Sequence, residues 1–108
     1  MKSNLDVKPA GEGDIESSRK VIRDEWGDNV KITNERYITT QEGSSNKFHY
    51  FAVVDQGSNF SSVHTYGRIG YTPKFEEMGL APTRQGAIGV YNNKLNQKIK
   101  KGYKEKKI

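Results

Sequence analysis

The fold is restricted most by residues 47–54, a run in which nearly every side chain is apolar or aromatic. Phe48, Tyr50, Ala52 and Val54 alternate there with Lys47, His49, Phe51 and Val53. Successive side chains of a strand point to opposite faces of its sheet, so both faces of this segment are largely apolar. A strand of this kind is typical of the interior of a sheet. We therefore predict a central strand at 47–54.

Further strands are predicted on both sides of this segment, because short β-rich runs alternate there with turn residues. Residues 30–40 contain one or two strand-like pieces, the better one at 36–40, and residues 41–46 form a loop. Residues 55–59, with Gly57, form a hairpin connection, and residues 60–70 return antiparallel. Residues 71–79 add another strand, which Pro73 confines to an edge or to a starting position.

The hydrophobic period changes to that of a helix beyond residue 82. One apolar stripe recurs at i, i+3, i+7 and i+11, formed by Ile88, Tyr91, Leu95 and Ile99. Thr83 is a suitable N-cap and Gly102 a natural stop. A second, basic stripe lies about 100° away on the same wheel and consists of Lys94, Lys98 and Lys101. The predicted fold is α+β: a small antiparallel sheet of about four to five strands with one long C-terminal helix packed on one face.

The N-terminal part of the chain holds little apolar bulk. We expect residues 1–29 to form a flexible tail with a possible short helix at 15–26, in which Ile15, Ile22 and Trp26 have helical spacing and Asp14 precedes them as a cap. The apolar stripe is thin, so a docked helix and an undocked one remain equal alternatives. The domain itself is predicted over 30–105, followed by a basic end at 106–108.

The positive charge of the chain is concentrated at its C-terminus. Residues 94–108 contain seven lysines and one acid, a local charge of +6, within a chain whose net charge is +5. Such a patch attracts polyanions and makes their binding depend on salt. The chain has no cysteine, no apolar run long enough to cross a bilayer and no apolar segment typical of a signal peptide. We therefore expect an intracellular, monomeric protein without a membrane partner.

The strand at 60–70 presents two different faces. Ser61, Val63, Thr65, Gly67 and Ile69 share one of them, which we expect to face the C-terminal helix. His64, Tyr66 and Arg68 then point away from the core. An aromatic ring beside a guanidinium group forms a surface for stacking and for binding phosphate. The alternative is a purely structural role, in which Tyr66 packs on cross-strand neighbours and Arg68 pairs with a surface carboxylate.

Three motifs follow one another along the chain. The first is Asn46-Lys47-Phe48, followed by His49. The second is Tyr66-Gly67-Arg68-Ile69-Gly70, and the third is the end of the helix, Lys100-Lys101-Gly102-Tyr103. Taken together, they resemble the WGR domain of poly(ADP-ribose) polymerases and related microbial proteins, in which the second motif reads Trp-Gly-Arg-Val-Gly and an aromatic residue stands at the position of His49. The resemblance covers residues 36–105 and departs from the family at Ala52, where a polar residue is common.

The resemblance implies an antiparallel sheet flanked by a helix and a role in DNA-break recognition and communication between domains. In the family, the tryptophan stacks on a ribose near a 5′ end, the arginine contacts phosphate and neighbouring domains, and the asparagine lies close by. These roles fall on Tyr66, Arg68 and Asn46. Tyrosine keeps a stacking face but makes it smaller than that of tryptophan.

The preferred hypothesis is a non-catalytic module that binds DNA or DNA ends, with RNA as another possible ligand. The candidate binding residues are Asn46, His64, Tyr66, Arg68, Lys94, Lys98, Lys101 and Tyr103. The alternative is a protein–protein or interdomain interaction module, for example one that docks on a separate catalytic partner. We expect no enzymatic activity, because no nucleophile–base pair, carboxylate pair or phosphate-binding loop is present. No cofactor and no metal site are predicted, since two histidines without a third ligand do not form a zinc site.

Overall fold

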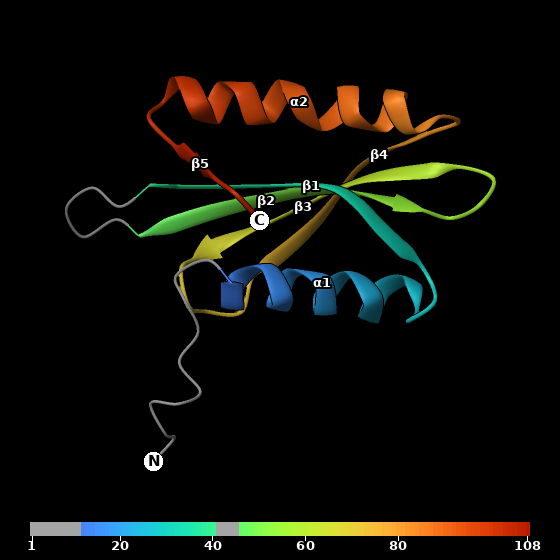
Figure 1. Cartoon of the computed structure of the whole chain (residues 1–108), viewed down its shortest axis with the longest axis horizontal. Helices are drawn as coiled ribbons and strands as arrows, with labels where there is room; N and C mark the ends of the chain where they lie inside the picture. The colour runs from blue at the N-terminus through green and yellow to red at the C-terminus, as the bar shows by residue number, and fades with distance from the viewer. Residues whose placement is uncertain (1–11, 41–45) are drawn as a thin grey trace, which may run out of the picture.

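The computed structural model describes residues 12–40 and 46–108, which form a five-stranded antiparallel sheet with a helix on each face (Figure 1). The strands are β1 (Lys31–Thr40), β2 (Lys47–Asp55), β3 (Phe60–Arg68), β4 (Lys74–Ala81) and β5 (Lys104–Lys106). Their order across the sheet is β4-β3-β2-β1-β5. The predicted α+β class and the central position of β2 are confirmed. The prediction for β4 is also confirmed, since it is an edge strand that begins directly after Pro73.

The two apolar faces of β2 are covered by different helices. Phe48, Tyr50, Ala52 and Val54 belong to one buried cluster together with Ile15 and Ile22 of the helix α1 (Glu12–Trp26). Phe51 and Val53 belong to a second cluster together with Ala87, Tyr91 and Leu95 of the helix α2 (Arg84–Lys100). All residues from Phe48 to Val54 are buried. The apolar character of both faces of this strand therefore reflects a three-layer arrangement of helix, sheet and helix.

Helix α2 begins and ends where the sequence predicts. Thr83 is the N-cap, and its side chain accepts a hydrogen bond of 3.1 Å from the backbone N–H of Gly86. At the other end Gly102 has φ of +110°, a left-handed conformation that favours glycine and stops the helix. One part of the predicted stripe is wrong, because Ile99 is 40% exposed. The buried row runs through Ala87, Tyr91 and Leu95 in steps of four residues, and each such step turns the row by about 40°, away from the sheet.

Helix α1 is docked on the sheet, which settles the alternative that the sequence left open. It begins at Glu12, earlier than predicted, and the expected flexible tail over 1–29 is wrong for this segment; residues 1–11 lie outside the described residues. Ile15 and Ile22 are buried, and Trp26 makes an edge-to-face contact with Phe75 of β4 at a ring distance of 5.5 Å. The possible helix at 15–26 is therefore present, and it forms a second helix packed on the sheet.

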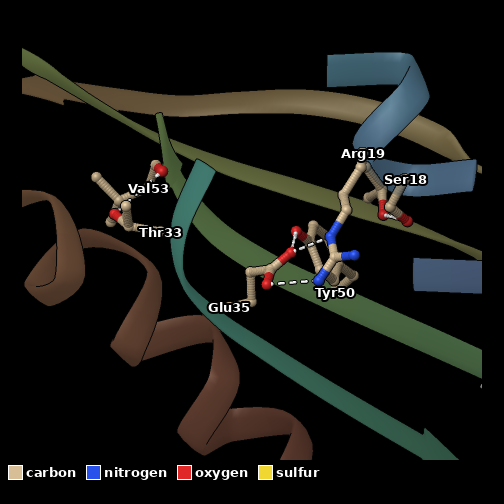
Figure 2. A network of polar contacts seen from close by, with 7 residues as sticks. Ser18, Arg19, Thr33, Glu35, Tyr50 and Val53 are labelled. Atoms are coloured by element: carbon tan, nitrogen blue, oxygen red, sulfur yellow. Dashed lines mark hydrogen bonds and ion pairs between the residues drawn. The ribbon is translucent and has the colours of Figure 1, made fainter. Parts of the chain in front are cut away.

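Polar contacts complete the docking of α1. The hydroxyl groups of Ser18 and Thr65, on β3, form a buried hydrogen bond of 2.5 Å. Arg19 donates two hydrogen bonds, of 2.5 and 2.8 Å, to the carboxylate of Glu35 on β1, and Tyr50 on β2 donates a third of 2.5 Å to the same carboxylate. Figure 2 shows how this network joins α1 to two strands. The thin apolar stripe is sufficient because these contacts supplement it.

The chain continues past α2 into a short edge strand that we did not predict. Lys104–Lys106 pair with Tyr37–Thr39 of β1, so Lys106 belongs to the sheet although it was assigned to a basic end. Side chains support this pairing, since the guanidinium group of Arg36 binds the carboxylate of Glu105 with two hydrogen bonds. The predicted loop at 41–46 lies almost wholly outside the described residues, which resume at Asn46.

Candidate functional site

The predicted orientation of β3 is wrong, and the correction defines the site. Val63 packs with the α1 cluster and Thr65 bonds to Ser18, so this face of β3 lies toward α1 and not toward α2. His64 and Tyr66 therefore lie on the α2 side of the sheet. Alternation along a strand separates two sets of side chains, but it does not say which set meets which helix when both faces are covered.

A groove of about 620 Å³ opens on the α2 side, between that helix, the ends of β2 and β3 and the segment after the helix. It is lined by Asn46, Lys47, Phe48, His49, His64, Tyr66, Gly67, Arg68, Lys74, Glu76, Lys94, Lys98 and Tyr103. Seven of the eight predicted site residues are among them, brought together from four segments of the chain. Lys101 is the exception: it is exposed and lies outside the groove lining.

The floor of the groove consists of stacked rings. The ring of His64 lies 4.6 Å from that of Phe51 and 4.8 Å from that of Tyr66, nearly parallel to both. The ring of His49 is nearly parallel to that of His64, with centroids 4.9 Å apart, and meets the edge of Tyr103 at 5.0 Å. His64 is only 2% exposed, so the expectation that it points into solvent is wrong. Tyr66 is partly exposed and lines the groove.

A chain of hydrogen bonds runs through this floor. His49 Nδ1 lies 2.7 Å from His64 Nε2, and His64 Nδ1 lies 3.1 Å from Glu76 Oε1. Burial lowers the pKa of His64 to about 4, although the hydrogen bond to Glu76 acts in the opposite direction. Burial, followed by the neighbouring His64 ring and Lys98, lowers the pKa of His49 to about 3. Both rings are therefore neutral at neutral pH.

The rim of the groove is basic. Five cationic side chains line it, those of Lys47, Arg68, Lys74, Lys94 and Lys98, against one carboxylate, that of Glu76. This carboxylate is already engaged, since Lys94 Nζ lies 3.5 Å from it. Burial, together with the charges of Lys101, Lys94 and Lys47, lowers the pKa of Lys98. The direction of this shift indicates a local excess of positive charge.

Lys47 and Arg68 are direct cross-strand partners in the register of β2 and β3. Partners on adjacent antiparallel strands point to the same face, and like charges in this position destabilise a sheet. The guanidinium group of Arg68 lies over the ring of Tyr71, 5.5 Å from its centroid. Lys47 was not among the predicted site residues.

The turn that follows Arg68 is held by hydrogen bonds to Asn46, just before β2, and to Asp14 of α1, on the other side of the sheet. The backbone N–H of Ile69 donates to the carbonyl of Asn46 at 2.9 Å, and the N–H of Gly70 donates to Asp14 Oδ1 of α1 at 2.8 Å. The second carboxylate oxygen of Asp14 accepts a hydrogen bond of 2.9 Å from the hydroxyl of Tyr37. Asp14 lies inside the first turn of α1 and is a tertiary contact, not the cap that we predicted.

The described residues also bear on metal binding and on membrane insertion. Within residues 12–40 and 46–108, no three His, Cys, Asp or Glu side chains gather in a way that could hold a metal ion. In the same part of the chain, no helix has the length and apolar character needed to cross a membrane.

The groove lies where the three sequence motifs meet, and a comparison with known proteins gives the same family. The sequence model of the WGR domain family matches residues 34–108 of the chain. No match was found among curated proteins or among solved structures. WGR domains are non-catalytic modules of nucleic-acid-binding type, found in poly(ADP-ribose) polymerases and related proteins. Because the match covers more than half of the 108 residues and contains every residue that lines the groove, the chain belongs to the WGR domain family.

Proposed function

We propose that the groove is a nucleic-acid-binding site that takes the sugar–phosphate backbone of DNA, in particular at a strand end. The main support is the placement of Lys47 directly opposite Arg68. This pair is unfavourable for the sheet alone, but an anion between the two side chains converts their repulsion into two attractive contacts. A backbone phosphate has the charge and the oxygen geometry that the arginine fork binds best.

The floor of the groove suits the nonionic part of a nucleotide. The exposed face of Tyr66 offers a stacking surface for a sugar or a base, and the neutral histidines add no charge to it. Asn46 lies at the same end of the groove and offers an amide group. Lys94 and Lys98 approach from α2, so a backbone that crosses the groove meets cations on both sides.

A titration of a fluorescently labelled DNA duplex with the protein, followed by anisotropy at several salt concentrations, tests this proposal. Binding should weaken steeply with salt, and Arg68→Ala should lower the affinity at least about tenfold, the loss expected for a charge-assisted contact. Absence of binding at low salt would refute the proposal.

A matched pair of variants separates the groove from general charge. Lys98 lines the groove, whereas Lys100 is exposed outside it, and both changes to alanine remove one positive charge. Lys98→Ala should reduce the slope of log affinity against log salt by about one, as expected for the loss of one phosphate contact. Lys100→Ala should leave the slope nearly unchanged. Equal effects of the two variants would show that only the charge of the chain matters.

A second candidate function, docking of a protein domain, is favoured by one observation. Tyr71 is 63% exposed and lies against Arg68 at the mouth of the groove, and tyrosine and arginine are frequent anchors of protein interfaces. Heparin distinguishes the two candidates. It should displace a nucleic acid from the basic rim, and it should have much less effect on a docked aromatic interface.

A further inference from the structure

The protonation pattern of the two histidines follows from the carboxylate at the end of their hydrogen-bond chain. Glu76 is ionised, since the hydrogen bond from His64 and the nearby Lys94 lower its pKa. A carboxylate only accepts, so His64 Nδ1 has to carry the proton in the 3.1 Å contact. The other nitrogen of His64 is then an acceptor. His49 Nδ1 must therefore be the donor in the 2.7 Å contact between the rings.

This assignment leaves His49 Nε2 without a proton. It makes no hydrogen bond to any residue within 12–40 or 46–108, and His49 lines the groove with 8% of its surface exposed. Burial and the surrounding lysines keep this nitrogen from being protonated. The groove thus combines a cationic rim with one fixed, neutral hydrogen-bond acceptor in its floor.

A matching ligand has to carry an anionic group and, close to it, a neutral O–H or N–H donor. A backbone phosphate supplies the first but has no proton to donate at neutral pH. The N–H donors that paired bases keep lie in the grooves of a duplex, so for a nucleotide bound through its sugar and phosphate the sugar is the source of the donor. An internal deoxyribose has no free hydroxyl, whereas a 3′ end has one and a ribonucleotide has another at its 2′ position.

We propose that His49 Nε2 accepts a hydrogen bond from a free sugar hydroxyl of the nucleotide that lies on Tyr66. This inference rests on the proposed nucleic-acid-binding function and adds a specificity to it. The phosphate of that nucleotide binds the rim and supplies most of the affinity, while the hydroxyl distinguishes a strand end or a ribonucleotide from the interior of a DNA strand.

The test uses DNA hairpins with a single blunt end, a phosphorylated 5′ terminus and three different 3′-terminal adenosines. These are 2′,3′-dideoxyadenosine without a hydroxyl, 2′-deoxyadenosine with only the 3′-hydroxyl, and 3′-deoxyadenosine with only the 2′-hydroxyl. A hydroxyl that reaches His49 should strengthen binding about 3- to 10-fold over the dideoxy hairpin, the effect of one neutral hydrogen bond. The hairpin that gains affinity identifies the source of the hydroxyl.

Two variants connect this preference with the histidine chain. His49→Phe keeps a ring at this position but removes the acceptor, so the hydroxyl preference should disappear and the three hairpins should bind with equal affinity. Glu76→Gln introduces an amide that can donate to His64 Nδ1, which lets the chain reverse and turns His49 Nε2 into a donor. The preference should fall in this variant too, although the loss of a negative charge strengthens binding of all three hairpins. Melting curves of both variants are the control and should show that each variant is folded.

The possible failures are distinguishable. Equal binding of all three hairpins, or a preference that survives His49→Phe, overturns this inference and leaves the proposed function standing. Absence of binding by every hairpin overturns both. The nitrogen chemical shifts of the histidine rings provide a readout without any ligand: we expect His49 protonated at Nδ1, and a ring protonated at Nε2 would refute the assignment directly.

Discussion

The contact between Asp14 and Gly70 predicts that a helix outside the matched family region supports the groove. Asp14 is 3% exposed and accepts hydrogen bonds from the Tyr37 hydroxyl and the Gly70 N–H. In Asp14→Ala the hydroxyl of Tyr37, which is 1% exposed, loses its acceptor without access to water. The N–H of Gly70 is more accessible and can turn to solvent. Since hydrogen bonds to charged groups contribute about 1.5–3 kcal/mol each, we expect a loss of about 2–4 kcal/mol in the free energy of unfolding.

The same change should weaken DNA binding, because it releases the turn that follows Arg68. Ordering the backbone of one residue costs about 1–2 kcal/mol, so the affinity should fall about 5- to 30-fold if binding has to fix this turn again. Tyr37→Phe is the control, since it removes one hydrogen bond of Asp14 and leaves the contact with Gly70 in place. It should lower the stability and leave the affinity close to that of the wild type.

Urea denaturation and anisotropy titration, both at a temperature where all variants are folded, measure the two effects separately. The reasoning is refuted if Asp14→Ala destabilises the fold but binds DNA as tightly as the wild type. In that case α1 would support the sheet without positioning the groove.

Three further predictions concern single positions. Burial alone would raise the pKa of Glu35, but the hydrogen bonds from Arg19 and Tyr50 hold this pKa below its ordinary value. The ionised carboxylate therefore stabilises the fold at pH values above its unfolded pKa of about 4.3. This stabilisation is lost as the pH falls through the lower pKa of the folded state. In urea denaturation, Glu35→Gln should cost about 1–3 kcal/mol at neutral pH and should lose less stability than the wild type on acidification; parallel pH profiles would contradict this. Tyr66→Trp enlarges the stacking face and should raise DNA affinity about 2- to 5-fold in anisotropy titrations, and a lower affinity would argue against stacking. Gly102→Ala places a side chain at φ of +110° and should lower the melting temperature by about 4–8 °C, a cost of roughly 1 kcal/mol; an unchanged melting temperature would show that the turn relaxes.

The elements that the sequence predicted well are those with strong local signals. The run around Phe51 is apolar in both alternating sets, which only a central strand with two covered faces satisfies. Helix α2 has a cap at Thr83, a helical period and a glycine stop, and each of these depends on residues close in sequence. Local agreement of this kind is why the fold class was accessible without coordinates.

The features that the sequence left open or did not indicate depend on contacts between distant residues. Helix α1 has few apolar residues, and its docking relies on Ser18 meeting Thr65 and on Arg19 meeting Glu35. All three residues of strand β5 are exposed, and the strand follows from pairing with β1, not from its composition. The two faces of β3 were assigned to the wrong sides, because the sequence does not show that a second helix covers the opposite face of the sheet.

Seven of the candidate residues named from the sequence line the groove, but the arrangement that brings them together was not predicted. Tyr66 and Arg68 were expected on a free face, whereas they lie on the side of the sheet that α2 partly covers, next to Lys94 and Lys98. Lys47 could have been found from the predicted hairpin, because a register that places Asp55 opposite Phe60 also places Lys47 opposite Arg68. The contact of Asp14 with Gly70 spans 56 residues, and no pattern in the sequence indicates it.

The central claim is that one groove, formed by the end of β3 and the C-terminal part of α2, contacts nucleic acid. An NMR titration with a DNA duplex carrying a 5′-phosphorylated end tests it most directly. We predict that the backbone amide signals of residues 64–70 and of residues 98–104 shift together, with the same dependence on DNA concentration. Shifts confined to residues 12–26, or to the terminal lysines alone, would contradict the account.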